Sequence, residues 1–364
     1  MQVNAKNTSK NNLKVAVGLS GGVDSSVAAY LLKEQGYAVV GVHLQCWDYK
    51  ADGCSGEEDR ADAVKVAAKL GIKFVSLNFE KEYREKVIDY FYKEYASGRT
   101  PNPDVMCNKE IKFGMFLNWA LQERFDFVAT GHYARVANNN GTYQLLMGID
   151  EKKDQSYFLY LLTQPQLEHT LFPLGEMKKT EVRELAEKVG FHTSHKKDSV
   201  GICFVGEVDI KDFLKKRIKE VQGDVVNIEG EVIGKHCGVS FYTIGQRHGF
   251  TVDKYSGLPM YVIGKDAAKN ELTVGYSKDG NVEKFNVVEI HWQQDVKHHY
   301  GKPEGLLCSV RIRHLGELYE GKLVLNESGL SGEVVLKDKI FGVAPGQSAV
   351  FYSKDLLLGG GVIN

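Results

Sequence analysis

The segment Val15-Ala-Val-Gly-Leu-Ser-Gly-Gly-Val-Asp-Ser-Ser26 constrains the fold of this chain more than any other. Its apolar run, 15–19, predicts a strand buried in a parallel sheet. The Ser-Gly-Gly turn at 20–22 lets the backbone bend tightly and approach a ligand, and the apolar residues of 27–32 then recur at helical spacing. The segment therefore predicts a helix N-terminus that offers backbone N–H groups, and the hydroxyls of Ser20, Ser25 and Ser26, to an anion such as phosphate.

This turn is not a Walker A loop, because no Gly-Lys-Ser/Thr follows it, and we therefore expect no lysine to reach the terminal phosphates. The carboxylate of Asp24 would repel a phosphate unless Mg²⁺ lay between them. The pattern Ser-Gly-Gly-x-Asp-Ser-Ser is that of the N-type ATP pyrophosphatases, or PP-loop enzymes. These enzymes hold the pyrophosphate end of ATP and transfer AMP to a substrate oxygen. An ordinary strand–turn–helix with a serine cap is the alternative interpretation.

Composition limits the class of protein. A chain of 364 residues predicts two or three domains, and 43% hydrophobic with 26% charged residues is typical of a globular protein. The formal charge of −1 gives no global attraction for nucleic acid, so RNA binding would need local patches. Residues 1–12 are polar and predict a disordered tail, and no apolar run suits a membrane span or a signal peptide, which indicates a cytoplasmic protein. Six cysteines without a Cys-x-x-Cys pair favour neither a disulfide framework nor a zinc site.

The order of predicted elements indicates three domains. Strands at 15–19, 37–44, 72–77 and 127–130 alternate with helices across residues 13–205, which predicts an α/β, doubly wound parallel sheet. The similarity of its first loop to the PP-loop pattern implies that this domain binds ATP. Ligands of such sheets lie beyond the carboxyl ends of the strands, so the Ser-Gly-Gly turn, Leu44 and Gly131 should converge there. Residues 206–280, with a charged helix at 207–219 and short β-type runs such as 239–244, predict a small central module. The short alternating strands of 281–364 predict a β-barrel.

A second informative stretch is Pro101-Asn-Pro-Asp-Val-Met-Cys-Asn-Lys109. Its two prolines fix a turn, and Cys107 precedes a predicted helix whose dipole, helped by Lys109, would lower the pKa of the thiol. Asp104 could move a proton or orient a substrate group. The alternative is a proline-rich connector with an incidental buried cysteine. A third stretch, 197–204, contains Cys203 between apolar residues, and by itself this cysteine is typical of a core thiol.

Taken together, these stretches make the chain similar to the tRNA-specific 2-thiouridylases, which convert the wobble uridine of certain tRNAs to 2-thiouridine. The resemblance runs essentially from end to end. It rests on Gly18-Leu-Ser-Gly-Gly-Val-Asp-Ser-Ser26, Thr100-Pro-Asn-Pro-Asp-Val-Met-Cys-Asn-Lys-Glu-Ile-Lys-Phe113, Ala129-Thr-Gly-His-Tyr133, Lys153-Asp-Gln-Ser-Tyr-Phe158, Gly201-Ile-Cys-Phe204, Thr243-Ile-Gly-Gln-Arg247 and Ala344-Pro-Gly-Gln347.

The resemblance implies roles for particular residues. Cys203 would carry the incoming sulfur as a persulfide, Cys107 would close a disulfide with it, and Asp104 would be the general acid/base. Asp24 is the candidate Mg²⁺ ligand. Residues that would bind ATP are Gly18, Leu19, Ser20, Gly21, Gly22, Val23, Asp24, Ser25, Leu44 and Gly131. The target base would meet Asn102, Pro103 and Asp104, and the tRNA would contact His132, Lys153, Asp154, Gln155, Arg313, His314 and Gln347.

The implied reaction is chemically reasonable. Adenylation turns the C2 oxygen of uridine, a poor leaving group, into AMP, and a nucleophilic sulfur then displaces AMP. The partners implied are tRNA, a protein that donates persulfide sulfur, and a reductant that resets the disulfide, with no membrane. The target base must leave its stack, which is easier in a loop. Two alternative hypotheses remain. The chain could be another PP-loop enzyme that adenylates a small molecule or a different tRNA base, or it could be a non-catalytic adenylate sensor.

The chain departs from the family pattern in two places. Leu44-Gln-Cys-Trp47 stands where relatives usually have Met-Lys-Asn-Trp, which adds Cys46 near another extra thiol, Cys54. These two could bind a metal, react, or remain free cysteines. Arg313-His314 stands where Arg-Tyr is common. A basic segment made of Lys211, Lys215, Lys216, Arg217 and Lys219, with Arg247 and His248 further on, could contact RNA or be a solvated helix face.

Overall fold

The computed structural model describes residues 12–47, 56–198, 201–206, 208–253 and 257–364. By its internal contacts the chain divides into two compact units. Unit 1 comprises Met1–Val87, Pro103–Glu207 and Ser353–Leu358, and unit 2 comprises Ile88–Asn102, Val208–Tyr352 and Gly359–Asn364. Residues 1–11 of the predicted tail, and Cys54, lie outside the described residues, so the structure does not test the predictions about them.

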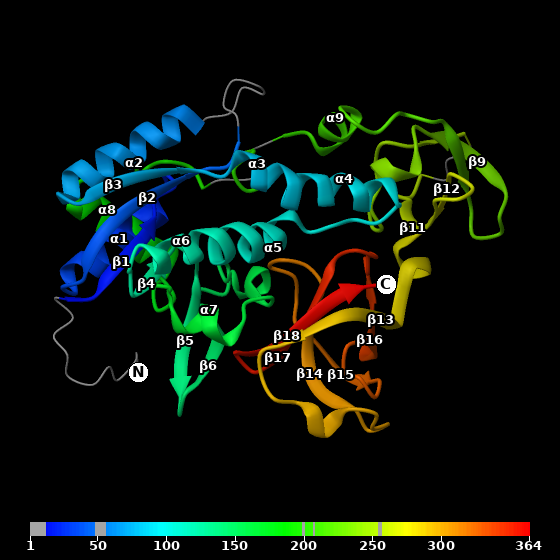
Figure 1. Ribbon diagram of the computed structural model, residues 1–364. Helices are drawn as coiled ribbons and strands as arrows, with labels where there is room; N and C mark the ends of the chain where they lie inside the picture. The colour runs from blue at the N-terminus through cyan, green and yellow to red at the C-terminus, as the bar shows by residue number, and fades with distance from the viewer. Residues whose placement is uncertain (1–11, 48–55, 199–200, 207, 254–256) are drawn as a thin grey trace. The chain divides into compact units, whose positions relative to one another are not determined.

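Unit 1 is built on a parallel sheet in the order β3-β2-β1-β4-β7. The central strand β1 (Lys14–Gly18) pairs in parallel with β2 (Ala38–Gln45) on one side and with β4 (Phe127–Ala129) on the other. Figure 1 shows α2 (Gly56–Leu70) on one side of this sheet and α6 (Leu117–Gln122) on the other. The doubly wound α/β fold predicted from the sequence is therefore confirmed.

Alternation along β1 explains why both faces of the sheet are covered. Val15, Val17 and Leu19 point to one face, where they form a core with buried residues of α1, α2 and α8. Gly18 lies on the other face, and a Cβ added to it would be 3.7 Å from the ring of Phe116.

The remaining elements of unit 1 are α1 (Val23–Glu34), β3 (Lys73–Asn78), α3 (Glu80–Tyr83), η4 (Ser156–Leu159), α7 (Gln164–Glu168), β7 (Thr170–Leu171) and α8 (Lys179–Val189); the π-helical stretch η2 (Arg84–Ile88) runs to the boundary between the units.

The most unusual helix of unit 1 follows the two prolines. It begins as α5 (Pro103–Cys107), continues as the π-helix η3 (Asn108–Phe116) and ends as α6. A π-helical stretch of this length is rare and such stretches are frequent at functional sites. The sequence predicts a helix after Cys107, but it does not predict that this helix has π-helical turns.

The elements of unit 1 that follow β4 were not predicted from the sequence, α7, β7 and α8 among them. A hairpin of β5 (Ala134–Asn139) and β6 (Thr142–Met147) follows β4, with Gly141 at a positive φ of 89° in its turn. The hairpin extends onto the start of β18 through the pair Leu146 and Leu356.

Unit 2 contains a five-stranded sheet, β10-β9-β8-β12-β11, and a barrel. The barrel follows the order β13-β16-β15-β14-β17-β18, and it closes because β13 (Asn281–Trp292) also pairs with β18 (Leu356–Ile363). The predicted C-terminal β-barrel is thus confirmed. The other elements of unit 2 are α4 (Asp89–Ala96), α9 (Ile210–Lys215), β8 (Gly223–Val226), β9 (Val232–His236), η5 (Val239–Phe241), β10 (Thr251–Val252), β11 (Tyr261–Asp266), β12 (Glu271–Gly275), η6 (Ser277–Gly280), η7 (Lys297–His299), β14 (Leu306–Arg311), β15 (Tyr319–Leu325), β16 (Gly332–Phe341) and β17 (Ser348–Ser353).

Two predicted elements of the central module differ from the structure. Residues 239–241 form a 3₁₀ turn, because Gly238 at a φ of 133° redirects the chain and donates its N–H to His236 Nδ1 at 2.9 Å. The charged helix is shorter than predicted, since Asp209 caps it by accepting from the Asp212 N–H at 2.9 Å. The domain boundaries at 205 and 280 stay predictions. Among the described residues no helix has the length and apolar character needed to cross a membrane.

The barrel core supplies a test of the fold. Leu323 in β15 is 0% exposed, whereas Leu307 on the neighbouring strand β14 is 78% exposed. Leu323→Ala should lower the free energy of unfolding by about 2–5 kcal/mol, because it leaves a cavity in the core. Leu307→Ala should change it by less than about 0.5 kcal/mol. Urea unfolding of both variants measures this, and equal effects would contradict the barrel packing.

Candidate active site

The Ser-Gly-Gly turn connects β1 to α1 in the way its sequence predicts. Gly21 adopts a φ of +77°, and a Cβ added there would lie 2.2 Å from the carbonyl oxygen of Asp59. Gly22 is the N-cap of α1 and provides no side-chain acceptor for the first N–H groups of the helix. These N–H groups therefore suit an anionic ligand.

The three serines of the loop do not behave alike. Ser20 is exposed, whereas Ser25 and Ser26 are buried and donate their hydroxyls to the Gly22 carbonyl at 3.1 and 2.8 Å. Ser25 Oγ also accepts the Ser20 N–H at 3.2 Å. From the sequence, all three hydroxyls are expected to face the anion. The structure instead turns two of them inward, where they shape the loop.

A lysine reaches the loop from a distant helix. Lys179, the first residue of α8, is 9% exposed, and its Nζ lies 2.8 Å from both carboxylate oxygens of Asp24 and 2.8 Å from Asp198 Oδ1. Tyr133 donates its hydroxyl to Asp24 Oδ1 at 2.8 Å. The sequence predicts that no lysine reaches the phosphates, whereas Lys179 lies beside the loop that would hold them. No sequence signal near the loop identifies Lys179, because 155 residues separate it from Asp24.

Lys179 and a second lysine, Lys153, keep the carboxylate of Asp198 ionised. Burial alone would raise the pKa of Asp198, but hydrogen bonds and charges from Lys153 and Lys179 lower it to about 2. Lys153 lies 2.6 Å from Asp198, and Arg183 lies 2.7 Å from it. The loop is therefore surrounded by charge pairs that could exchange partners when an anion binds.

The other predicted lining residues lie at the carboxyl edge of the sheet, as expected. Leu44 is near the end of β2, and His43 beside it hydrogen-bonds the Leu19 carbonyl through Nδ1 at 3.1 Å. Burial lowers the pKa of His43, so this ring is neutral. Gly131 packs on the loop itself, since a Cβ there would lie 2.9 Å from the Asp24 carbonyl carbon and from the Ser25 nitrogen. Only glycine fits at position 131.

The residues present are compatible with ATP and Mg²⁺. The described part of the chain holds no group of three or more His, Cys, Asp or Glu side chains placed to bind a metal. Mg²⁺ is commonly held by one or two carboxylates together with substrate phosphates, so Asp24 beside the loop suffices as the protein ligand. The exposed Ser20 and the uncapped N–H groups of α1 suit the phosphates.

The two cysteines singled out from the sequence are in contact. Cys107 ends α5 and is 0% exposed, whereas Cys203 is partly exposed, and a side-chain hydrogen bond joins the two free thiols. Cys203 sits in a tight turn in which the Ile202 N–H donates to the Gly206 carbonyl, with Phe204 at a φ of +66°. Asp104 Oδ1 accepts the Cys203 N–H at 3.1 Å, and the Tyr83 hydroxyl donates to the Cys203 carbonyl.

The charges around this thiol pair are unequal. The hydrogen bond from Cys107, together with the nearby Lys112 ammonium, holds the pKa of Cys203 well below that of an ordinary thiol. Burial raises the pKa of Cys107, and the negative Cys203 sulfur raises it further. Burial, followed by the charge of Cys203, raises the pKa of Asp104 to about 7.

This corrects one prediction about reactivity. The expected activation of Cys107 by a helix dipole and Lys109 is not found, because Cys107 lies inside a continuous helix and Lys109 is exposed beside Glu110 at 3.5 Å. The thiol whose pKa is lowered is Cys203, and the ammonium beside it is Lys112, whose Nζ lies 3.3 Å from Sγ. Neither Cys203 nor Lys112 carries a sequence signal of this pairing, since they are 91 residues apart.

Cys46 belongs to the same region. It is buried directly after β2, and burial followed by the charge of Cys203 raises its pKa well above the ordinary value. It is a free cysteine, which is one of the alternatives that the sequence left open.

Some of the residues predicted to contact tRNA are buried and others are exposed. His132 is buried against Thr130 Oγ1 at 2.7 Å, and Asp154 is 0% exposed and accepts from Gly148 N and from Ser156 N and Oγ. Gln155 Oε1 accepts the Tyr133 N–H at 3.1 Å. These side chains hold the fold of unit 1 in this structure, and their contact with tRNA stays a prediction.

Other expected contacts lie at the surface. Lys153 is half-exposed in unit 1 beside the Asp198 pair. In unit 2, Arg313 is exposed, His314 is partly exposed, and Gln347 donates Nε2 to the Thr100 and Pro101 carbonyls at 2.9 and 3.1 Å. That contact fixes the segment directly before Asn102, which is partly exposed like Pro103.

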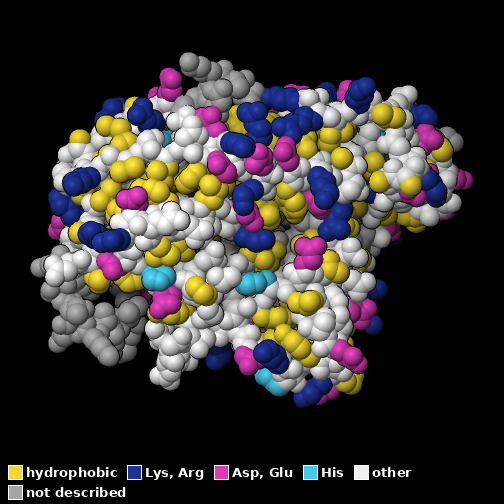
Figure 2. All heavy atoms as spheres, in the orientation of Figure 1, with side chains coloured by type: hydrophobic (Ala, Val, Ile, Leu, Met, Phe, Trp, Pro, Cys, Tyr) yellow, Lys and Arg dark blue, Asp and Glu magenta, His cyan; other side chains and the backbone are white. Residues whose placement is uncertain are grey.

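The basic segment around α9 is largely paired within unit 2. Lys215 lies 3.2 Å from Glu220, Arg217 bonds to Asp89, and Lys216 lies 5.4 Å from the Phe213 ring centroid. Figure 2 shows acidic side chains interspersed with the basic ones on the face it draws. This pairing favours the interpretation of a solvated face, although Arg247 and His248 remain exposed.

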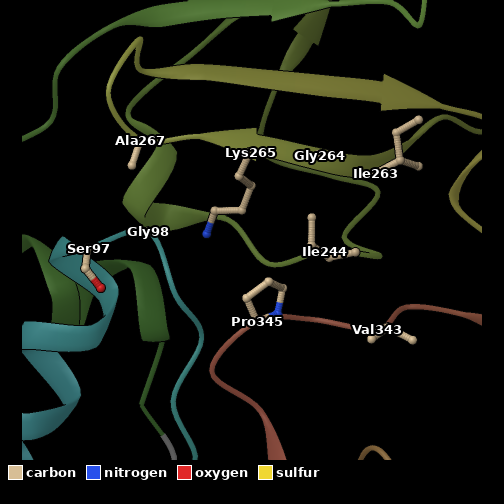
Figure 3. A pocket seen from close by; sticks show the side chains of 9 residues that line it. All are labelled: Ser97, Gly98, Ile244, Ile263, Gly264, Lys265, Ala267, Val343 and Pro345. Carbon is tan, nitrogen blue, oxygen red and sulfur yellow. The ribbon is translucent and has the colours of Figure 1, made fainter. Parts of the chain in front are cut away.

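Unit 2 also contains a cavity of about 340 Å³ (Figure 3). Its walls are mainly apolar, and the Lys265 side chain points into it. Lys265 donates to the Tyr242 carbonyl, and burial lowers its pKa to about 8. The lining residues are Ser97, Gly98, Ile244, Ile263, Gly264, Lys265, Ala267, Val343 and Pro345.

Comparisons with known proteins cover nearly the whole chain. Three family models match in order, described as tRNA methyl transferase HUP domain over residues 13–207, tRNA methyl transferase PRC-barrel domain over 211–276, and aminomethyltransferase beta-barrel domain over 282–363. The tRNA-specific 2-thiouridylase MnmA of Bacillus licheniformis is 46% identical over 96% of this chain and 95% of its own length. Those of Listeria innocua and Streptococcus agalactiae are each 45% identical over 98% of this chain and 96% of their own.

Among solved structures, a 4-thiouridine synthetase in complex with RNA and ATP is 16% identical and covers 56% of this chain and 50% of its own. Its TM-score is 0.34, and this structural similarity is too low to support a conclusion about function.

The raised pKa of Asp104 predicts a pH effect on stability. The folded protein keeps this carboxyl protonated up to about pH 7, whereas an unfolded Asp loses its proton near pH ~3.9. The stabilisation is therefore fully present below pH ~4 and is lost as pH rises through about 7. Asp104→Asn should flatten the fall in unfolding free energy over this window, as urea titrations at several pH values would measure. Asp338→Asn, at an exposed position, should leave the wild-type slope, and equal slopes in all three proteins would contradict the prediction.

Proposed function

This chain belongs to the tRNA-specific 2-thiouridylase family of ATP-dependent tRNA-uridine 2-sulfurtransferases, and we propose that it thiolates the wobble uridine through a persulfide on Cys203. The observation that supports this proposal most directly is the contact between the Cys107 and Cys203 thiols beside Asp104. A pair of cysteines and a carboxyl group with a pKa near neutrality are the groups that sulfur transfer requires.

The first step in the proposal activates the base with ATP. Ser20, the N–H groups of α1 and Asp24 would hold the pyrophosphate end of ATP, and Mg²⁺ on Asp24 would neutralise the charge of the phosphates. Lys179 is bonded to both Asp24 and Asp198, so it could keep one carboxylate while it turns toward a phosphate. Transfer of AMP to the C2 oxygen then creates a good leaving group.

The second step transfers sulfur. The terminal sulfur of the Cys203 persulfide attacks C2, and AMP departs with the bonding electrons of the C2–O bond. Cys107 then attacks the Cys203 sulfur, and the broken S–S bond leaves its electron pair on the sulfur attached to C2. The products are 2-thiouridine and a Cys107–Cys203 disulfide, which a two-electron reductant must reopen. Asp104, hydrogen-bonded to Cys203 and with a pKa of about 7, is suited to exchange the proton.

The tRNA side of the proposal rests on the family. Asn102, Pro103 and Asp104 would receive the extruded base, and the contacts predicted from the sequence in both units would hold the tRNA. Surface residues such as Lys153 and Arg313 are the better placed of these contacts. A protein that donates persulfide sulfur would load Cys203, whose partial exposure allows access.

A reconstitution experiment tests the proposal. The protein is incubated with ATP, Mg²⁺, a persulfide donor and unmodified tRNA, and 2-thiouridine, AMP and pyrophosphate are measured. All three products should form in equal amounts. If a different tRNA base were modified, or if a small molecule were adenylated instead, the result would support the alternative of another PP-loop activity.

Cys203→Ser should abolish thiolation but leave adenylation intact, because the serine hydroxyl cannot carry sulfur yet the ATP loop is unchanged. The matched control is Cys308→Ser, another partly exposed free thiol, in the barrel of unit 2, which should retain both activities. Formation of 2-thiouridine by the Cys203→Ser protein would remove Cys203 from the mechanism.

Asp24→Ala should raise the KM for Mg²⁺-ATP by about tenfold or more, equivalent to roughly 1.4 kcal/mol of lost binding. The variant removes the proposed metal ligand and leaves Lys179 without one of its partners. Asp338→Ala, at an exposed position in β16, is the control. Pyrophosphate release at varied ATP and Mg²⁺ measures the effect, and ATP kinetics equal to the wild type would refute the role of Asp24.

A further inference from the structure

The π-helix η3 places a lysine on the same side of its helix as the reacting groups. In an α-helix, residues five apart lie about 140° from one another around the axis, given 3.6 residues per turn. The wider i→i+5 turns of a π-helix bring such residues onto one face. Lys112 follows Cys107 by five positions, and its Nζ donates to Cys203 Sγ at 3.3 Å while Cys107 hydrogen-bonds the same residue. The helix therefore supplies two of the partners of the Cys203 sulfur.

The charge of Lys112 is directed at sulfur and not at a carboxylate. Lys86 and Lys109, the neighbouring lysines, lie 2.8 and 3.5 Å from Glu110. Lys112 forms no salt bridge within 4 Å to a carboxylate of the described residues, and its ammonium lies 5.8 Å from the centroid of the Phe204 ring. A partly buried ammonium without a close carboxylate needs a negative partner, and Cys203 is the group it contacts.

We propose that Lys112 is a catalytic residue that holds the Cys203 sulfur, and then the persulfide formed on it, as an anion for attack. The inference rests on the proposed role of Cys203 as the sulfur carrier. The thiolate is the nucleophilic form of cysteine, and a neighbouring ammonium stabilises it. In the loading step, the Cys203 thiolate attacks the outer sulfur of the donor protein's persulfide. A new S–S bond forms on Cys203, and the donor's cysteine leaves as a thiolate.

The arrangement also orders the two cysteines. Cys107 is buried and donates its hydrogen to the Cys203 sulfur, and the negative charge on Cys203 opposes ionisation of Cys107. Cys203 therefore reacts first, with the donor. Cys107 ionises only after sulfur transfer to the base has removed the negative charge at Cys203. Of the other titratable groups nearby, burial raises the pKa values of Asp104, Cys46 and Tyr83, and the carboxylates of Glu80 and Glu82 act on Cys46. After the hydrogen bond from Cys107, the Lys112 ammonium is the next group that lowers the pKa of Cys203, and among these groups it is the cation.

The experiment measures the ionisation of Cys203 separately from catalysis. Alkylation of Cys203 by iodoacetamide is followed against pH by peptide mass spectrometry in wild type, Lys112→Met and Lys112→Arg. Methionine keeps the apolar stem of the lysine and removes its charge, and arginine restores the charge. The matched control is Lys109→Met, an exposed lysine three positions earlier on the same helix. Lys112→Gln is used if the methionine variant does not fold.

Lys112→Met should move the alkylation midpoint of Cys203 upward by at least about one pH unit, a tenfold loss of thiolate at a given pH. Lys112→Arg should recover most of the shift, and Lys109→Met should match the wild type. With a persulfide donor and tRNA at pH 7, Lys112→Met should lose at least about tenfold in 2-thiouridine formation and regain activity as pH rises. Pyrophosphate release in a single turnover, which reports the adenylation step alone, should be unaffected, whereas AMP release should fall together with thiolation.

Two results would overturn the inference. An unchanged Cys203 midpoint in a folded, uncharged Lys112 variant would show that the lysine does not set the ionisation. A shifted midpoint with wild-type thiolation at pH 7 would show that the ion pair is not catalytic. Thiolation by Cys203→Ser would instead defeat the proposed function, while the alkylation result for Lys112 would still stand or fall by itself.

Discussion

The parallel pairing of β1 between β2 and β4 is the constraint on which the rest of unit 1 depends. Parallel strands end at the same edge of a sheet, so the loops that follow them meet there. This edge carries the Ser-Gly-Gly turn, the residues after β2 that include Cys46, and Gly131 after β4. The fit is tight, since any side chain at 131 would strike the first turn of α1. The nucleotide loop therefore owes its shape to the sheet as much as to its own residues.

Both chemical centres of unit 1 balance a negative group with a lysine that lies outside the recognisable motif. Asp24 in the loop is matched by Lys179 from α8, and the Cys203 sulfur is matched by Lys112 from η3. Burial makes an unpaired charge costly, so each pair holds its geometry until another charge arrives. An ATP phosphate and a transferring sulfur are both negative, and each would meet a cation already in place. In the proposed mechanism, each lysine would therefore be in place before an anionic reactant binds.

Much of this arrangement could be predicted from the sequence. The apolar run at 15–19, the glycines at 21 and 22 and the alternation of elements are local patterns, and they led to the sheet, the loop and the barrel that the structure has. The hairpin of β5 and β6 was missed because its strands mix polar and apolar residues and contain no long apolar run. The helix at 207–219 was overestimated because charged residues are compatible with a helix without requiring one, and Asp209 delays its start. The inward turn of Ser25 and Ser26 was missed because local hydrogen bonds compete with ligand contacts.

By itself the sequence determined which residue types are present and how each segment prefers to fold, because periodicity, glycine and proline act over a few neighbours. It identified Asp104, Cys107 and Cys203 as candidates, but it could not say that the two thiols touch or which of them is ionised. Only the tertiary structure decided this, by bringing Lys112 to Cys203 and by burying Cys107 more deeply than its partner. The ionisation of a thiol depends on charges and solvent within a few ångströms, and those neighbours come from parts of the chain that are far apart in sequence.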